Sequence, residues 1–102
     1  MKKVINRKRY DTDTAKKVAW WSTGGSMSDF RYSEEDLYRK KTGEFFVHGQ
    51  GHGMTRWGTS KDNGNSRGWG EDIQPLTEEE ARDWVEHYSN EDYEAIFGEV
   101  EE

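Results

Sequence analysis

The alternation of apolar and polar positions is clearest in the middle of the chain, where it predicts a β-hairpin. Residues 36–40 and 44–48 have the composition of strands, and Lys41-Thr42-Gly43 connects them. A three-residue connection that contains glycine suits a bulged hairpin turn. We expect these two strands to form the centre of a sheet. Their inward side chains would be Leu37 or Tyr38 and Phe45 or Val47.

Shorter patterns on either side predict further strands. Residues 3–10 are typical of two short strands about Asn6-Arg7, a turn in which asparagine can take the left-handed conformation. Residues 72–76 are typical of a short edge strand, because Pro75 near its end lacks the N–H that a central strand would need. We therefore expect a small antiparallel sheet.

The last third of the chain has helical periodicity. Thr77 and Glu80 have the spacing of a capping box, which marks the start of a helix. Asn90 is in position to cap a second helix over 91–97, and Gly98 would end it. The apolar stripe of the first helix would consist of Leu76, Ala81, Trp84, Val85 and Tyr88.

A further helix is predicted over residues 14–21, near the N-terminus. Asp11 or Thr12 would cap it, and the pair Gly24-Gly25 would end it. Its apolar face would consist of Ala15, Val18 and Ala19 together with Ser22.

Two adjacent tryptophans lie in this predicted helix. Trp20 and Trp21 would point about 100° apart, so they cannot both face the same core. One of them, which we take to be Trp20, is a candidate anchor for a partner. The alternative is that it packs beneath the loop near Trp57 or Trp69.

These elements together predict a single α+β domain over residues 1–98. It would have a small antiparallel sheet built from hairpins, an N-terminal helix and two C-terminal acidic helices. Residues 49–70 are rich in glycine and lack periodicity, which is typical of a long functional or disordered loop. Residues 99–102 would form an acidic tail.

Charge is divided unequally along the 102 residues. Residues 71–102 hold 13 acidic side chains and one basic side chain, a net charge of −12, within a total of −6. Residues 1–41 hold 11 basic and six acidic side chains, a net charge of +5. Fields of opposite sign steer partners of the complementary sign, so the division favours an interaction protein over a catalyst.

Composition sets further limits. Apolar residues make up 30% and charged residues 35% of the chain, close to disordered sequences, but 5 Trp, 5 Tyr and 4 Phe can build a small core. The chain has no cysteine, which suits a reducing cytoplasm and excludes disulfides. No signal peptide or membrane span is apparent, so we expect a cytoplasmic protein.

The acidic residues of the two C-terminal helices are the leading candidate site. Held in a row, their carboxylates would imitate phosphates and occupy a basic nucleic-acid channel. The alternative is a charged helix face that only keeps the protein soluble. The candidate partner-binding carboxylates are Glu78, Glu79, Asp83, Glu86, Glu91, Asp92 and Glu94.

The basic residues of the N-terminal half offer a second possibility, direct contact with nucleic acid. The total charge of −6 disfavours independent nucleic-acid binding, and this half could instead neutralise the acidic half. The residues concerned are Lys2, Lys3, Arg7, Lys8, Arg9, Lys16, Lys17, Arg39, Lys40 and Lys41.

Other chemistry has weak signals. His48 and His52 lie four residues apart, but the glycines between them disfavour a helical zinc pair, and we expect no metal and no cofactor. No acid, base and nucleophile converge in the sequence, and pairs such as Glu34-Glu35 are frequent in so acidic a chain. We therefore do not expect an enzyme.

Four stretches, residues 9–15, 37–46, 75–81 and 93–98, resemble small proteins encoded by phages and mobile elements of Gram-positive bacteria. Some small proteins from these elements are anti-CRISPR inhibitors, including inhibitors of Cas9. The resemblance implies a non-enzymatic blocker that acts by binding. Together with the division of charge, it leads us to expect a monomer or weak dimer that binds a Cas9-like host effector or its guide-RNA complex. The alternative is a small nucleic-acid-binding or regulatory module that uses the basic N-terminal half.

Overall fold

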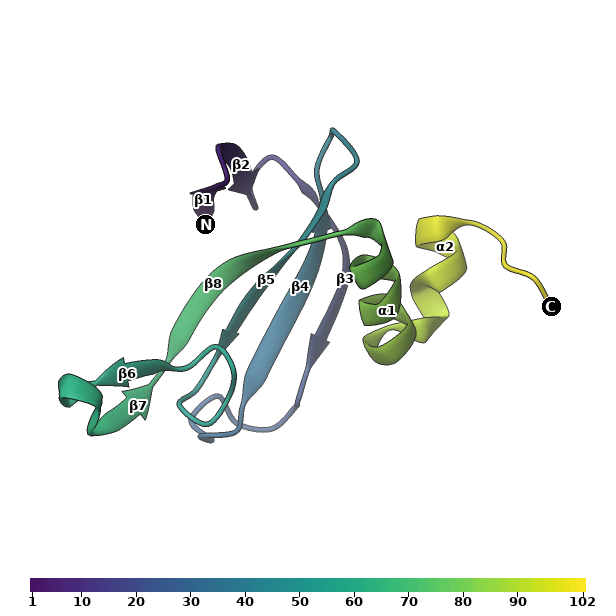
Figure 1. Cartoon of the computed structure of the whole chain (residues 1–102). Coiled ribbons are helices and arrows are strands. Elements are labelled where there is room, and N and C mark those ends of the chain that lie inside the picture. Colours follow the sequence, from purple (N-terminus) through teal and green to yellow (C-terminus); the bar gives the residue numbers. More distant parts are fainter.

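The centre of the fold is an antiparallel sheet of four strands in the order β3-β4-β5-β8 (Figure 1). The computed structural model describes every residue from Met1 to Glu102. Helices cover one face of the sheet and an N-terminal hairpin covers part of the other. The strands are β3 (Lys16–Ser22), β4 (Ser33–Arg39), β5 (Phe45–Gly51) and β8 (Gly70–Leu76).

The predicted central hairpin is confirmed. β4 and β5 take the two inner positions of the sheet, and Leu37 lies opposite Val47 in their register. Gly43 in the connection has a φ of 94°, a conformation that glycine adopts without strain. Leu37 and Val47 are fully buried towards the helices, and Phe46 is fully buried on the opposite face. The first three residues of β5, Phe45 to Val47, are therefore apolar on both faces.

The N-terminal hairpin is also confirmed. It consists of β1 (Lys2–Ile5) and β2 (Lys8–Asp11). Asn6 and Arg7 both have positive φ, at 50° and 67°, as a two-residue turn between twisted strands requires. The hairpin contacts the sheet through Tyr10, whose ring packs edge-on against Phe46 at 5.5 Å between centroids.

The predicted N-terminal helix is wrong, because residues 16–22 form strand β3, which pairs with β4. The β-branched and aromatic residues in this segment suit a strand better than a helix. A register shift between Lys17 and Ala19 explains the misleading pattern. Val18 is the extra residue at the bulge, so the apolar residues Val18 and Ala19 are adjacent in the sequence. Together with Ala15 they have the spacing of one face of a helix.

The α+β description must be corrected accordingly. Strands make up 41% of the chain and form three sheets, and the only α-helices are short and lie at the C-terminal end. Both predicted C-terminal helical segments are present. They are α1 (Glu78–Tyr88), a 3-10 turn η2 (Asn90–Asp92) and α2 (Tyr93–Phe97). Neither α-helix is long and apolar enough to cross a membrane.

The capping box of α1 is confirmed, whereas the predicted cap of the second helix is wrong. The Thr77 hydroxyl accepts a hydrogen bond from the Glu80 amide at 3.1 Å, and the Glu80 carboxylate accepts one from the Thr77 amide at 2.9 Å. The Asn90 amide group instead donates to the carbonyl of Glu86 at 3.2 Å. Asn90 therefore ties η2 to the end of α1, and Gly98, with a φ of 95°, follows α2.

The segment predicted as a loop over 49–70 is largely ordered. β5 continues to Gly51, and β6 (Thr59–Lys61), the 3-10 turn η1 (Asp62–Gly64) and β7 (Ser66–Gly68) form a hairpin that projects from the sheet (Figure 1). β8, the predicted edge strand, then runs along the edge of the main sheet. Only residues 52–58 remain as an irregular loop.

A glycine of this segment is required for packing rather than for flexibility. A Cβ atom on Gly49 would lie 2.0 Å from the Trp57 ring, far inside van der Waals contact. The buried Trp57 ring therefore packs directly against the backbone of Gly49.

We predict that Gly49→Ala lowers the free energy of unfolding by about 1 to 3 kcal/mol, because the added methyl group must displace Trp57 or β5. Urea denaturation followed by tryptophan fluorescence measures the change. Ser60→Ala, at an exposed position of β6, serves as the control and should leave the free energy within about 0.5 kcal/mol. Equal stability of Gly49→Ala and the wild type would contradict this packing.

Candidate functional site

The outer side of α1 presents carboxylates in fixed positions. Its inner side buries Ala81, Trp84 and Val85 against the sheet. Residues on the opposite side of the helix face solvent, among them Glu79, Asp83 and Glu86. We call the seven predicted carboxylates of α1, η2 and α2 the acidic face; they are Glu78, Glu79, Asp83, Glu86, Glu91, Asp92 and Glu94.

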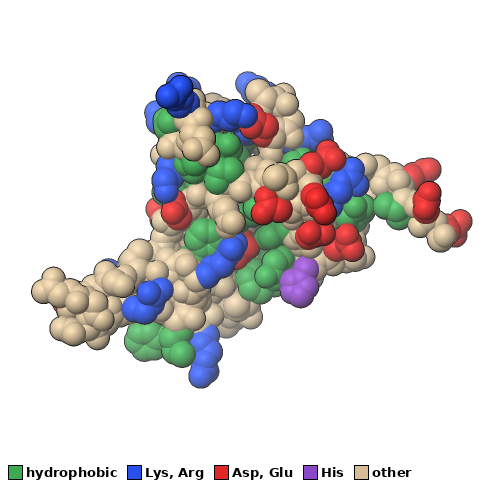
Figure 2. Space-filling view, in the orientation of Figure 1, with side chains coloured by type: hydrophobic (Ala, Val, Ile, Leu, Met, Phe, Trp, Pro, Cys, Tyr) green, Lys and Arg blue, Asp and Glu red, His purple; other side chains and the backbone are tan.

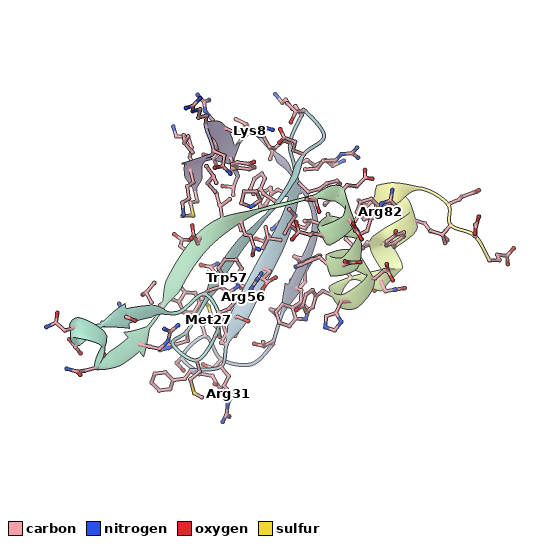
Figure 3. All side chains as sticks on the ribbon, in the orientation of Figure 1. Lys8, Met27, Arg31, Arg56, Trp57 and Arg82 are labelled. Carbon is pink, nitrogen blue, oxygen red and sulfur yellow. The ribbon has the colours of Figure 1, made fainter.

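One cation lies among these carboxylates. Arg82 contacts Glu78 at 3.5 Å, donates to the Tyr93 hydroxyl at 3.0 Å and lies 4.7 Å from the centroid of the Phe97 ring (Figure 3). It thereby connects α1 to α2. No other residue of the acidic face forms an ion pair, so the basic N-terminal half does not neutralise this surface.

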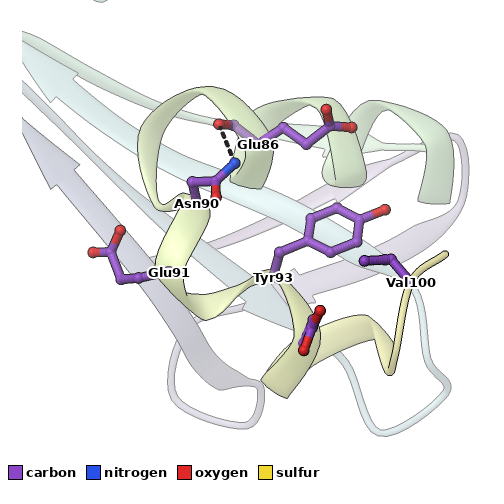
Figure 4. A pocket seen from close by; sticks show the side chains of 6 residues that line it. Glu86, Asn90, Glu91, Tyr93 and Val100 are labelled. Carbon is purple, nitrogen blue, oxygen red and sulfur yellow. Dashed lines mark hydrogen bonds between the residues drawn. The ribbon is translucent and has the colours of Figure 1, made fainter. Parts of the chain in front are cut away.

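Three of the predicted carboxylates surround one hollow between α1 and the C-terminal segment (Figure 4). The hollow has a volume of about 430 Å³ and is open to solvent. Tyr93 and Val100 supply its apolar wall. Glu86, Glu91 and Glu94 line it together with Asn90.

Trp20 lies on the edge strand β3 next to this surface, on the face of the sheet opposite the helices. Its side chain is 64% exposed, and it shares a second hollow with Glu91 and Asp92. Trp21 instead packs against Tyr88, with 4.5 Å between ring centroids. The prediction that one of the two tryptophans is free is confirmed, although the cause is the alternation of a strand and not the turn of a helix. Trp20 does not pack beneath Trp57 or Trp69.

The remaining predicted residues lie apart from these two hollows. Asp83 borders a third hollow on the other flank of α1, together with Glu80 and His87. Glu78 and Glu79 occupy the first turn of the helix. The two hollows share Glu91, so five of the predicted residues lie close together. These are Trp20, Glu86, Glu91, Asp92 and Glu94. Glu78, Glu79 and Asp83 lie further towards the start of α1.

The sequence analysis missed a buried carboxylate that holds this arrangement together. Glu35 of β4 is only 4% exposed. Its Oε1 accepts a hydrogen bond from Trp84 Nε1 at 2.8 Å, and its Oε2 accepts from Trp57 Nε1 at 3.0 Å and from Arg56 Nε at 3.1 Å (Figure 3). We call Glu35, Arg56, Trp57 and Trp84 the Glu35 clamp.

The Glu35 clamp joins three separate parts of the chain. Glu35 belongs to β4, Arg56 and Trp57 to the 52–58 loop, and Trp84 to α1. A buried carboxylate is costly unless hydrogen bonds and a countercharge compensate it. Here two indole N–H groups and one guanidinium do so, and no buried side-chain polar atom in the structure lacks a partner. The clamp therefore fixes the position of α1 on the sheet.

Strand alternation was a signal by which Glu35 could have been found. Leu37 was a candidate for the inward face, and residues two apart on a strand share a face. Placing Leu37 inward would have placed Glu35 inward as well. Instead, the Glu34-Glu35 pair was treated as one of many acidic pairs.

The two histidines considered as metal ligands have other partners. His48 Nε2 lies 2.9 Å from a Glu71 carboxylate oxygen, on the sheet. His52 Nδ1 accepts a hydrogen bond from the Gly53 amide at 2.7 Å, and its ring packs edge-on against Phe30. Nowhere in the chain do three or more Asp, Glu, His or Cys side chains converge in an arrangement that could hold a metal ion.

A row of side chains crosses the sheet on the face opposite the helices. Trp20 lies opposite Asp36 on the neighbouring strand, and Asp36 lies opposite His48. Burial raises the pKa of Asp36 above its ordinary value of 3.8, while Lys17, at 3.8 Å, opposes that shift. The fold therefore disfavours the ionised form of Asp36.

Comparison of the chain with models of protein families, with curated proteins and with solved structures finds no match.

We predict that Glu35→Gln lowers the free energy of unfolding by about 2 to 3 kcal/mol. The glutamine NH₂ group would face an indole or guanidinium donor, and a buried donor would lose its partner. Chemical denaturation measures the effect. The same change at Glu79, which has no hydrogen bond or ion pair, should stay within about 0.5 kcal/mol. Equal effects at the two positions would show that the clamp does not stabilise the fold.

We predict a pH-dependent effect of Asp36→Asn. The folded protein has the higher Asp36 pKa, so folding is disfavoured as pH rises through the interval between the ordinary value of 3.8 and the raised value. Asparagine has no carboxyl group to ionise, so the variant lacks this loss of stability. The stability of Asp36→Asn relative to the wild type should therefore be greater at pH 7 than at pH 3, as measured by urea denaturation. A relative stability that falls between pH 3 and pH 7 would contradict the burial of this charge.

Proposed function

We propose that this protein is a non-enzymatic inhibitor of the anti-CRISPR type that acts in the bacterial cytoplasm. It binds a Cas9-type effector through the acidic face and blocks the effector's nucleic-acid binding or activation. The observation that carries the proposal is the position of an exposed tryptophan beside carboxylates that a buried contact holds in place. The resemblance to phage and mobile-element proteins supports the same class of function.

Electrostatics supports a basic partner. The acidic face has seven carboxylates and one cation, Arg82, that pairs with Glu78. A surface of one sign attracts a partner surface of the opposite sign and raises the rate of association. CRISPR effectors hold nucleic acid in a positively charged channel, so a rigid row of carboxylates could occupy that channel in place of phosphates.

Rigidity supports recognition over simple solubility. The acidic face lies on α1 and the segment that packs on it, and α1 is anchored by Ala81, Val85 and the Glu35 clamp. Groups that are already ordered lose little conformational freedom when a partner binds. A charged tail such as residues 99–102 would lose more.

Trp20 supplies the apolar part of the surface. Exposed tryptophans are frequent anchors of protein interfaces, because a large ring contributes much contact area at small entropic cost. Glu91 and Asp92, which line the same hollow from the helical layer, would form a polar border on one side of it. The partner would therefore present an apolar recess next to basic side chains.

The acidic face predicts the effect of charge reversal. The triple variant Glu79→Lys, Asp83→Lys and Glu86→Lys should raise the concentration for half-inhibition of target-DNA cleavage at least ten-fold. The assay is run with a Cas9-type nuclease that the wild type inhibits. A ten-fold change corresponds to about 1.4 kcal/mol of binding free energy. The three substitutions change the charge of the surface by six units, so a loss of this size is expected.

A matched control has the same charge change in the tail. Glu99→Lys, Glu101→Lys and Glu102→Lys should stay within about two-fold of the wild type, because these three exposed side chains lie outside the acidic face and do not line its hollow. Stoichiometry separates blocking from catalysis: inhibition should titrate near one to one and not increase with time. Equal inhibition by both triple variants would exclude the acidic face, and failure of the wild type to inhibit any nuclease in a broad panel would reject the proposed function.

A further inference from the structure

A second charged surface, of opposite sign, lies where the β4–β5 connection meets the N-terminal hairpin (Figure 2). Two adjoining hollows there share Thr14, Lys40 and Lys41 in their walls. We call their six cations the basic site; they are Lys8, Arg9, Lys16, Arg39, Lys40 and Lys41.

The fold brings these cations together from separate segments. Lys8 and Arg9 belong to β2, and Lys40 and Lys41 follow β4. Lys16 at the start of β3 lies directly opposite Arg39 at the end of β4. Like charges at directly opposed positions of a sheet destabilise it. The opposed pair therefore concentrates positive charge at this end of the sheet, where Arg39 also lies 5.4 Å from the centroid of the Phe45 ring.

Most of the positive charge in the basic site is unneutralised. Glu44 binds Lys8 at 2.9 Å and Lys40 at 3.4 Å, and the Lys8 hydrogen bond holds the pKa of Glu44 below its ordinary value. Arg9, Lys16 and Lys41 form no side-chain hydrogen bond or ion pair, and all three are exposed. Counting the carboxylates Asp11 and Glu44 that line the same hollows, six cations and two anions leave a net charge of +4.

We propose that the basic site binds the phosphodiester backbone of a nucleic acid. Guanidinium groups match phosphate oxygens in pairs, and ammonium groups add charge along the backbone. Thr14 and Thr42 line the same hollows. Their hydroxyls donate to the Asp11 carbonyl at 3.5 Å and to the Glu44 carboxylate at 3.2 Å, so a phosphate would have to replace these acceptors.

The lining favours nucleic acid over a lipid surface. No apolar side chain lines the hollow that contains Lys8 and Arg9, and Ala15 is the sole apolar residue of the adjoining one. Peripheral membrane binding combines cations with large apolar side chains that enter the bilayer, and these hollows supply none. No residue of the basic site belongs to the acidic face, so substitutions can remove the charge of one surface and leave the other unchanged.

The test uses the full chain and fluorescently labelled 30-nucleotide single strands of RNA and of DNA. Anisotropy titrations at 50, 100 and 200 mM NaCl should show binding that weakens steeply with salt, because phosphate contacts release counterions. Arg9→Gln with Lys41→Gln should bind at least five-fold more weakly at 50 mM. It should also lower the slope of log affinity against log salt by about 1.4, since each phosphate contact contributes about 0.7 for single strands.

Two further variants make the test specific. Arg31→Gln with Lys61→Gln removes the same charge from exposed positions outside the basic site and should bind within about two-fold of the wild type. Glu44→Gln should bind more tightly than the wild type, because it removes an anion and frees Lys8 and Lys40. Binding of RNA, of DNA or of both with this pattern supports the proposal and identifies the source of the phosphates.

Several results would overturn it. These are no binding at 50 mM NaCl, equal losses in the two double variants, and weaker binding by Glu44→Gln. Displacement by polyglutamate at the same charge concentration as by unlabelled oligonucleotide would indicate an acidic protein ligand instead. Binding only to vesicles that contain phosphatidylglycerol would indicate a membrane ligand.

Discussion

The carboxylate of Glu35 is the contact on which the rest of the structure depends. It is the point at which β4, the 52–58 loop and α1 meet, through hydrogen bonds from Trp57, Trp84 and Arg56. A small apolar core alone leaves a helix some freedom to slide, because apolar contacts are not directional. Hydrogen bonds to a buried charge are directional and short, so they define one position for α1 and for the carboxylates on its outer side.

The two layers that cover the sheet carry opposite charge. The helical layer holds the acidic face, and the N-terminal hairpin with the β4–β5 connection holds the basic site (Figure 2). No ion pair joins the helical layer to the N-terminal hairpin: Lys3 pairs with Asp72 of β8 at 2.5 Å, and Lys8 pairs with Glu44 within the basic site at 2.9 Å. Each surface therefore keeps its charge for a partner. A net charge of −6 describes this molecule poorly, since a partner meets one layer or the other.

Local signals in the sequence predicted the elements that local physics determines. The Lys41-Thr42-Gly43 connection and the Thr77 capping box each act within a few residues, and both were found. β3 was missed because its bulge at Val18 breaks the two-residue period. The 49–70 segment was misjudged because Gly49 serves close packing with Trp57 and not flexibility.

Long-range contacts explain what the sequence could not show of the candidate site. The helical period of α1 placed Glu79, Asp83 and Glu86 outward, as predicted. Glu35, however, meets Trp57 and Trp84 across 22 and 49 residues of chain, and no local pattern encodes such partners.

Hydrogen exchange of the five tryptophan indole N–H groups, followed by NMR in one sample, tests directly whether the clamp holds α1. The Trp57 and Trp84 groups should exchange as slowly as the amide of Val47, and the exposed Trp20 group rapidly. Exchange of Trp57 and Trp84 at the rate of Trp20 would contradict the clamp.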